Sequence, residues 1–364
     1  MPPPIDRRSF IRSASVAALA VAGAGRLSGA TLPARPIRVA QIGTDHSHAG
    51  AKWRTLQDLP EFFDPVGIFE PVQVNREGAM EDGDFEGARW LSEEELFTGG
   101  GVDAVLIETD LPGLVHWADR ALAQGWHVHI DKPPGRDLAG LAGLQEKALE
   151  MHRTLQMGYM FRYHPAFTFC LQAVRSGWLG KIHAIHGDIG KAIGAERRPG
   201  LAESYGGSMM LLGCHLLDLA VAILGRPENV RFFRRNSHPE HDAFMDNETA
   251  VLEYSDAVAT IRSLLFEVGG GDRRQFVVLG EKGTVEIRPL EPARLRLVLA
   301  EPAGAYPAGE HAVPIASVNG RYRTQLEDFA RMARGAPTIL TGFSPQHDRL
   351  VQEVLAQASG LPFR

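Results

Sequence analysis

Residues 37–50 read IRVAQIGTDHSHAG, and the organisation of the whole chain follows from this stretch. An apolar run ends at Gly43 and is followed by residues with helical spacing. A strand, a glycine turn and a helix, in that order, begin a dinucleotide-binding βαβ unit. The glycine fingerprint is incomplete, because its second and third glycine positions hold Asp45 and His48. The turn therefore either binds a dinucleotide in an altered way or serves another ligand.

Length and composition set limits on the rest of the chain. A chain of 364 residues exceeds one ordinary core, so two domains are expected. Its content of 44% hydrophobic and 23% charged residues is typical of a soluble globular enzyme. A net charge of −6 argues against nucleic acid or an anionic membrane as the main partner. Cys170 and Cys214 alone build no disulfide framework.

The first thirty residues have the pattern of a targeting segment. Arg7 and Arg8 precede Ser9 and Phe10, and an apolar, alanine-rich run follows over residues 13–25. That run is short for a membrane span, and small residues at 28–30 offer a cleavage site. We therefore predict a twin-arginine signal peptide over residues 1–30, and a periplasmic or secreted protein with no membrane anchor after processing.

The two halves of the remaining chain differ in pattern. Strands alternate with helices over residues 37–157, which predicts a Rossmann-type, doubly wound parallel sheet. Residues 158–362 predict an α+β domain with a large, mostly antiparallel sheet. Its expected strands cover residues 182–188, 248–254, 257–265, 275–279, 284–287 and 294–299. Two closing helices, over residues 323–334 and 346–359, are expected to pack back on the first domain.

Ligands of an open parallel sheet bind at the carboxyl ends of its strands. Glu70 ends the second predicted strand, where an acid binds the adenine ribose, although it follows Gly43 by 27 residues rather than the usual separation of about 20. The predicted contacts of NAD or NADP are Gly43, Thr44, Asp45, His46, Glu70, Thr109, Asp131 and Pro133.

The same turn also allows a divalent metal. His46 and His48 flank one position of the loop, and a D-H-x-H cluster supplies ligands that such an ion accepts. A third histidine could come from His129 or His116. A metal site at His46, His48 and His129 is thus an alternative to the dinucleotide.

Four segments together resemble one family. After the Gly43 turn come HVHIDKPP from residue 127, GYMFRYHPAF from residue 158 and GGSMMLLGCHLLD from residue 206. This order is similar to that of the Gfo/Idh/MocA family, named after glucose–fructose oxidoreductase and inositol dehydrogenase, over roughly residues 37–362. Asp131-Lys132-Pro133 resembles its E-K-P signature, and Gly213, His215 and Asp218 resemble the helix that carries its catalytic histidine.

The resemblance implies bound NAD or NADP and a sugar, sugar derivative or cyclitol as substrate. It implies that Lys132 contacts substrate and the nicotinamide ribose, that His215 takes the hydroxyl proton, and that the second sheet mediates a homo-oligomer. The family places an assisting Asp four residues before that histidine, where this chain has Leu211. The family segment T-P-N-x-x-H is also altered, to residues 109–114, TDLPGL. The chain is therefore a divergent member.

Three functions remain open from the sequence. The first, which we favour, is an exported NAD(P)-dependent oxidoreductase, with Lys132 and His215 as its catalytic pair. The second is a lyase or hydrolase of keto-sugars that uses the same pair, with or without a metal. The third is a binding protein without catalysis. The residues expected on the substrate side are Tyr159, Arg162, Tyr163 and His164.

Overall fold

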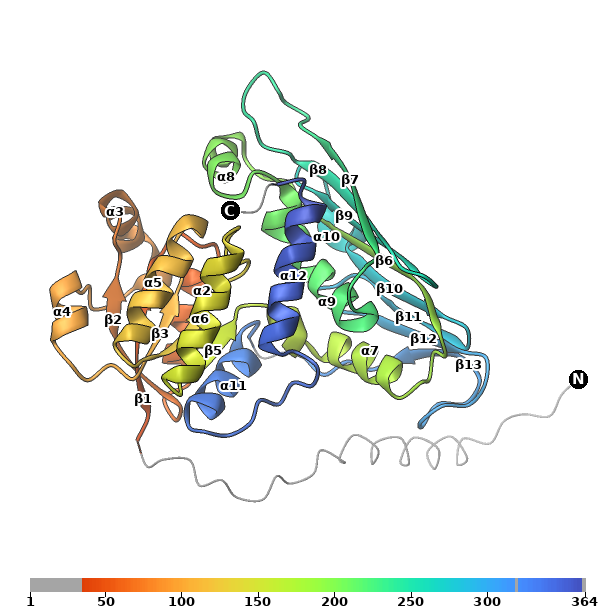
Figure 1. Ribbon diagram of the computed structural model, residues 1–364, viewed down its shortest axis with the longest axis horizontal. Helices are drawn as coiled ribbons and strands as arrows, with labels where there is room; N and C mark the ends of the chain where they lie inside the picture. Colours follow the sequence, from red (N-terminus) through yellow and green to blue (C-terminus); the bar gives the residue numbers. More distant parts are fainter. Residues whose placement is uncertain (1–34, 318–319, 362–364) are drawn as a thin grey trace, which may run out of the picture.

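The computed structural model describes residues 35–317 and 320–361, which form two sheets with helices between and around them (Figure 1). The fold class predicted from the sequence, a parallel Rossmann-type sheet followed by a large and mostly antiparallel one, is confirmed. The signal peptide predicted at residues 1–30 lies outside the described residues. In the part of the chain that the structure covers, no helix combines the length and the apolar character needed to cross a bilayer.

The first sheet has five parallel strands in the order β2-β1-β3-β4-β5. β1 and β3 are almost entirely buried, because helices cover both faces of the sheet. The strands are β1 (Ile37–Ile42), β2 (Phe63–Phe69), β3 (Ala104–Ile107), β4 (His127–Ile130) and β5 (Leu155–Met157). The helices of this half are α2 (Ala49–Gln57), α3 (Gln73–Glu81), η1 (Gly83–Phe85), α4 (Glu93–Thr98), α5 (Leu111–Ala123) and α6 (Leu138–Glu150).

Local sequence explains where these helices begin. Ser92 and Glu95 form a capping box at the start of α4. Asp110 caps α5 by accepting the backbone N–H of Gly113, and Pro112 stands in the first turn. The altered TDLPGL segment therefore has a local structural role as a helix start.

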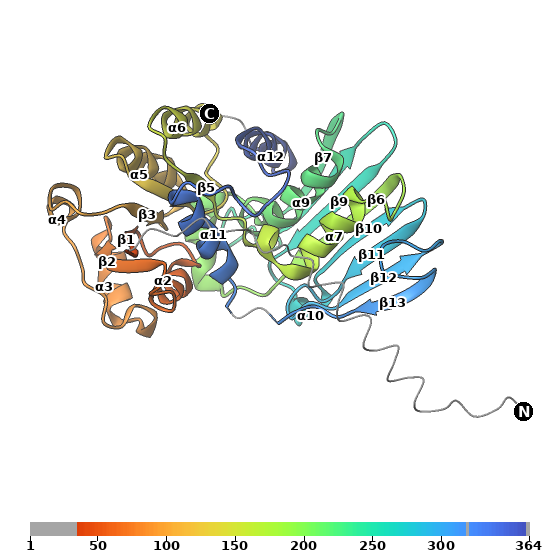
Figure 2. The same ribbon diagram turned by 90° about the horizontal axis from the view of Figure 1, so that it is seen from below.

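The second sheet has eight strands in the order β13-β12-β11-β10-β6-β9-β8-β7, and only β6 and β9 pair in parallel. Among the described residues, its helices gather on the face toward the first domain, and no helix covers the opposite face (Figure 2). The strands are β6 (Ile182–Gly190), β7 (Asn229–Arg235), β8 (Asn247–Glu253), β9 (Val258–Leu264), β10 (Gln275–Gly280), β11 (Gly283–Ile287), β12 (Leu295–Leu299) and β13 (Gly309–Val313). Self-association through this sheet stays a prediction.

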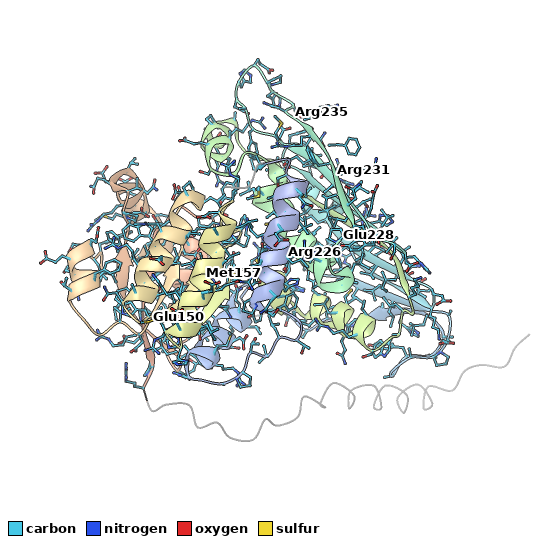
Figure 3. The ribbon with its side chains drawn as sticks, in the orientation of Figure 1. Glu150, Met157, Arg226, Glu228, Arg231 and Arg235 are labelled. Atoms are coloured by element: carbon cyan, nitrogen blue, oxygen red, sulfur yellow. The ribbon has the colours of Figure 1, made fainter. Side chains whose placement is uncertain are left out.

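The two edge strands of this sheet, β7 and β13, are not among the strands predicted from the sequence. β7 carries exposed residues on both faces, among them Phe232, Phe233 and Arg235, so its pattern shows no alternation. Figure 3 shows Arg231 and Arg235 on this strand, on the side of the molecule away from the first domain. β13, the other edge strand, is also mostly exposed. Edge strands bury little surface, which is why periodicity alone does not locate them.

The remaining helices connect the two sheets. They are η2 (Met160–Tyr163), α7 (Pro165–Arg175), η3 (Ala195–Arg197), α8 (Arg198–Tyr205), η4 (Met209–Gly213), α9 (Cys214–Leu224), α10 (Gly270–Arg273), α11 (Arg323–Ala333) and α12 (Pro345–Ala358). η4 is a π-helical turn that runs directly into α9. The Glu248 carboxylate holds this turn by accepting the backbone N–H of Met209 at 2.6 Å. α11 packs against α2, and α12 packs against both α6 and α9.

Gly43 has a backbone conformation that favours glycine. Its φ is +91°, and a Cβ there would lie 2.6 Å from the backbone nitrogen of Thr109. A Cβ added at Gly143, in the middle of α6, would meet nothing within 4 Å, and the φ of this glycine is ordinary for a helix. Glycine-to-alanine variants at these two positions can therefore be compared, one strained and one unstrained.

We predict that Gly43→Ala lowers the free energy of unfolding by about 2 kcal/mol or more, because strain and a backbone clash add. Gly143→Ala should instead raise it by up to about 1 kcal/mol, since alanine is the better helix former. Urea denaturation followed by circular dichroism measures both. Equal stabilities of Gly43→Ala and the parent protein would contradict the tight turn.

Candidate functional site

The carboxyl ends of β1, β3 and β4 meet at one edge of the first sheet, and polar side chains gather there. The loop after β1 carries His46 and His48, Glu108 follows β3, and Asp131 follows β4. All four are buried. Edges of this kind are where open parallel sheets bind ligands.

Lys52 lies at the centre of this group. It projects from α2 and is 0% exposed. Its ammonium donates to Glu108 Oε1 at 2.6 Å and to Asp131 Oδ2 at 2.5 Å, and lies 2.8 Å from His129 Nε2. A buried ammonium needs such partners, because removing it from water without them is very costly.

The two carboxyl groups around Lys52 differ in their acidity. Burial raises the pKa of Glu108 well above its usual value, despite the nearby Lys52. Burial also opposes ionisation of Asp131, but His46 and Lys52 outweigh it and hold the pKa of Asp131 well below the usual value. Asp131 is therefore the carboxylate of the cluster.

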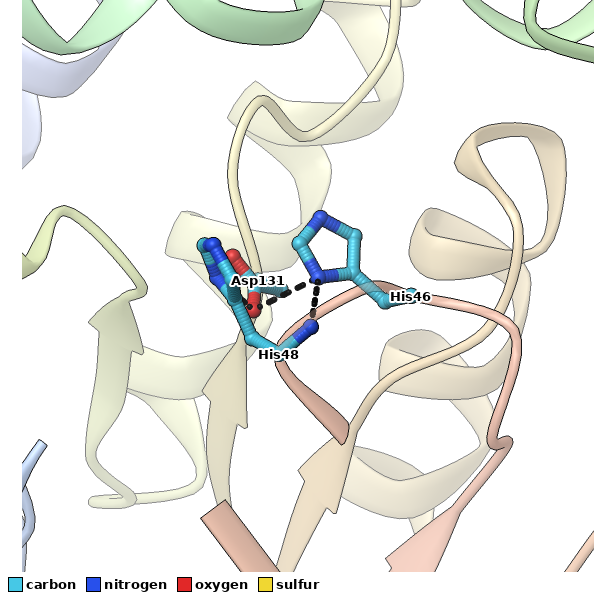
Figure 4. Close-up of side chains that lie close together, drawn as sticks. All are labelled: His46, His48 and Asp131. Atoms are coloured by element: carbon cyan, nitrogen blue, oxygen red, sulfur yellow. Dashed lines mark hydrogen bonds and ion pairs between the residues drawn. The ribbon is translucent and has the colours of Figure 1, made fainter. Parts of the chain in front are cut away.

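His46 and His48 both turn toward Asp131 (Figure 4). The Nδ1 atoms of His46 and His48 lie 3.1 Å and 3.0 Å from Asp131 Oδ2. Burial lowers the pKa of both imidazoles, so they are neutral near pH 7. Together with Asp131 they form a buried group of potential metal ligands.

His129 and His116, the predicted sources of a third metal ligand, are not part of this group. His129 Nε2 contacts Lys52, and its Nδ1 lies 2.7 Å from Gln156 Oε1, so both ring nitrogens have partners within the protein. His116 is on the exposed side of α5. The expectation of His129 as the third ligand is corrected: Asp131 stands in that place, because the end of β4 carries it to the same edge as the loop.

Lys132 and His215 come together across the two domains. Lys132 is 2% exposed and its ammonium donates to the carbonyl of Leu211 at 3.1 Å, one turn before His215. The ring of His215 lies 5.1 Å from that of Phe161 and 6.2 Å from those of Tyr159 and His48, between centroids. Within the described chain its Nδ1 has no hydrogen-bond partner. Burial, followed by Lys132 and His48, holds the pKa of His215 well below 6.5.

Asp218 does not replace the missing carboxylate beside His215. Arg162 donates to both of its oxygens, at 2.7 and 2.9 Å, and His347 Nε2 lies 2.8 Å from Oδ1. Arg162 also pairs with Asp348 at 2.8 Å. These contacts tie α9 to η2 and α12, so the donors of Arg162, expected on the substrate side, are engaged within the protein.

The predicted cofactor residues also gather at this edge, but several are already engaged. Glu70 accepts the backbone N–H of Thr44 at 2.5 Å and its hydroxyl at 2.7 Å. Burial and Asp110 raise the pKa of Asp45. Gly43 packs on Thr109. Pro133 follows Lys132 through a cis peptide bond.

Two cavities flank the site. One of about 460 Å³ is lined by Phe161, Tyr163 and His164, among others, and Phe161 is also the residue whose ring lies 5.1 Å from that of His215 between centroids. The other, of about 260 Å³, lies between the β1–α2 loop and the second domain and is lined by Asp45, Lys191 and Leu211. Substrate contact by Tyr159, Tyr163 and His164 stays a prediction.

Sequence reasoning missed Lys52 and Glu108. Two weak signals were present: Lys52 follows His48 by one helical turn and so shares its helix face, and Glu108 directly follows a fully apolar strand. Neither signal identifies the partner, because Lys52 and Asp131 are 79 residues apart in the chain.

The buried histidines make stability depend on pH. Burial and Lys52 lower the pKa of His129 from 6.5 to about 3. Below about pH 6.5 the unfolded chain takes up a proton that the folded chain does not, so stability falls as the pH falls.

We predict that the loss of unfolding free energy between about pH 7.5 and about pH 5 is smaller by about 2 kcal/mol in His129→Gln than in the parent protein. The exposed His116→Gln should behave like the parent. Urea denaturation at both pH values measures the difference. An unchanged pH dependence in His129→Gln would contradict a neutral, buried His129.

Comparison with known proteins shows what this chain is similar to. The GFO/IDH/MocA C-terminal domain matches residues 168–286. An uncharacterized oxidoreductase, YhhX of Escherichia coli, is 29% identical over 198 residues, which are 52% of this chain and 54% of that protein. The chain thus matches only about half the length of this relative. A D-xylose 1-dehydrogenase (NADP(+)) of Haloferax volcanii is 27% identical over 71% of this chain and 76% of that protein.

Solved structures with a similar fold come from the same group of proteins. The crystal structure of a UDP-N-acetylglucosamine 3-dehydrogenase from Acidithiobacillus ferrooxidans superposes with a TM-score of 0.71 at 21% identity, covering 89% of this chain and 96% of that one. The family model, the relatives and the fold agree: residues 168–286 match the C-terminal domain of the Gfo/Idh/MocA family, and the whole chain resembles proteins of that family in sequence and fold.

Proposed function

We propose that this protein is an NAD(P)-dependent oxidoreductase that acts on a hydroxyl group of a sugar, sugar derivative or cyclitol. The strongest support comes from Lys132 and His215. Both are buried, and Lys132 donates to the carbonyl one helical turn before His215, at the edge of the first sheet where such folds bind ligands. Relatives named as a D-xylose dehydrogenase and a UDP-N-acetylglucosamine dehydrogenase support the substrate class.

The edge of the first sheet has several of the features that bind a dinucleotide. The Gly43 turn, an acid after β2 and Thr109 after β3 stand where a dinucleotide meets a Rossmann sheet. Glu70 would have to exchange its bond with Thr44 for the ribose hydroxyls. When bound, NAD(P) supplies the acceptor for the hydride.

The protein's own residues handle the proton and the orientation. The Lys132 ammonium holds the substrate oxygen and stabilises negative charge on it. His215 is neutral and accepts the hydroxyl proton. Because no carboxylate among the described residues contacts His215, its imidazolium form is less stabilised than in an acid-supported pair.

A second candidate is a lyase or hydrolase of keto-sugars, with the same two residues moving protons. It is favoured by Glu70, which already occupies the Thr44 N–H, and by Asp45, which would lie close to a bound pyrophosphate. A proton beside a carbonyl is acidic enough to leave without carboxylate support for His215.

We predict that His215→Ala lowers turnover of the sugar alcohol at least about a hundredfold, the usual contribution of a general base. Leu211→Asp should preserve or raise turnover, because it restores a carboxylate near His215, and the backbone carbonyl that receives Lys132 remains. His116→Ala, exposed on α5, should change nothing.

The assay follows nicotinamide absorbance and product release over a panel of sugar alcohols and their keto forms. Rapid product release from the keto forms, with no nicotinamide reduction on any alcohol, would replace the oxidoreductase by the second candidate.

We also propose export by the twin-arginine route, from Arg7 and Arg8 ahead of the apolar run. The double variant Arg7→Lys, Arg8→Lys should leave the precursor in the cytoplasm of a bacterial host with that route. Cell fractionation and immunoblotting detect it, with Arg26→Lys as the matched control. Equal export of the double variant would contradict the proposal.

A further inference from the structure

His46, His48 and Asp131 each offer one potential ligand atom, and these atoms all lie within 4.8 Å of one another. The two Nδ1 atoms lie 3.1 and 3.0 Å from the same oxygen, Asp131 Oδ2. Two ligands that share a metal ion at about 2.0–2.2 Å are about 2.8–3.6 Å apart for angles between octahedral and tetrahedral. The observed separations lie at the lower end of this range.

Hydrogen bonding alone does not account for the contacts. Asp131 Oδ2 has two lone pairs, yet three nitrogen atoms approach it: those of Lys52, His46 and His48. His46 Nδ1 also accepts the backbone N–H of His48 at 3.3 Å. A neutral nitrogen that accepts a hydrogen bond has no proton to donate to Asp131. A cation between the three atoms removes this conflict.

We propose that His46, His48 and Asp131 bind one divalent first-row transition-metal ion, in a site with two imidazoles and one carboxylate. This goes beyond the proposed oxidoreductase function and holds whether the reaction moves a hydride or only a proton. Two imidazole nitrogens and one oxygen favour Zn²⁺, Co²⁺ or Fe²⁺ over Mg²⁺ or Ca²⁺.

The surroundings suit such an ion. Lys52 donates to Asp131 Oδ2, and the backbone N–H of Lys132 donates to Oδ1 at 2.6 Å. Both carboxylate oxygens are therefore fixed by hydrogen bonds from the protein. Lys52 supplies one positive charge beside two buried carboxyl groups, Asp131 and Glu108, so the cluster offsets part of the charge of a bound divalent ion.

Three protein ligands leave coordination positions for a substrate. The ring of His48 lies 6.2 Å from that of His215, between centroids, so the metal site and the proposed base are neighbours. A sugar hydroxyl or carbonyl oxygen bound to the ion would be polarised beside His215. The metal would thereby supply the electrostatic help that Leu211 does not give.

The test uses the full-length mature protein, stripped with a chelator and titrated with Zn²⁺ by calorimetry and with Co²⁺ by visible absorption. We expect one equivalent of each, with cobalt ligand-field bands that report nitrogen and oxygen ligands. His46→Ala, His48→Ala and Asp131→Asn should each weaken binding about a hundredfold or more. His116→Ala is the matched control and should bind as the parent does.

Circular dichroism and thermal melting of each metal-free variant check folding. Should Asp131→Asn fail to fold because Lys52 loses a partner, the two histidine variants decide. Less than stoichiometric binding by the folded parent, or equal binding by parent and His46→Ala, overturns the proposal. NAD(P) titration and turnover of the metal-free parent are measured separately, so failure of the metal site is distinguishable from failure of the oxidoreductase function.

Discussion

The buried ion pair between Lys52 and Asp131 is the interaction on which the candidate site depends. It joins α2, which follows the first strand, to the end of β4, and Glu108 adds the end of β3. An ammonium and carboxylates without water gain stability only when their geometry is good, and breaking one partner leaves an uncompensated charge. The three strand ends are therefore held in one arrangement, and His46, His48 and Lys132 take their positions from it.

A second buried ion pair fixes how the two domains meet at this edge. Arg162 follows the last strand of the first sheet, and Asp218 lies on the helix that carries His215. Asp348 on α12 completes the group. With these charges paired, α9 holds His215 opposite Lys132, and Asp218 serves the architecture. The same pairing explains why Asp218 gives His215 no carboxylate support.

The site combines features of a dinucleotide-binding edge with features that oppose one. Gly43 keeps the tight turn, yet Glu70 occupies the first N–H after it, and Asp45 adds negative charge nearby. Histidines at the following positions turn inward to Asp131. A metal ion held there and a dinucleotide beside it would divide the work that an acid-supported histidine performs alone.

The sequence alone determined most of the strands, the order of the two sheets and several helix starts. These depend on local causes: an apolar run before Gly43, the capping box at Ser92, and the alternation of residues in β6 and in β8 to β12. The exposed edge strands β7 and β13 lack such a pattern, and Lys52 looked like any helical lysine. Only the tertiary structure decided that Lys52 lies beside Asp131, that Asp218 pairs with Arg162, and that Asp131 rather than His129 completes the histidine group. The reason is physical: burial and pairing of charge arise from segments 56 to 79 residues apart, and no local pattern encodes which charge meets which.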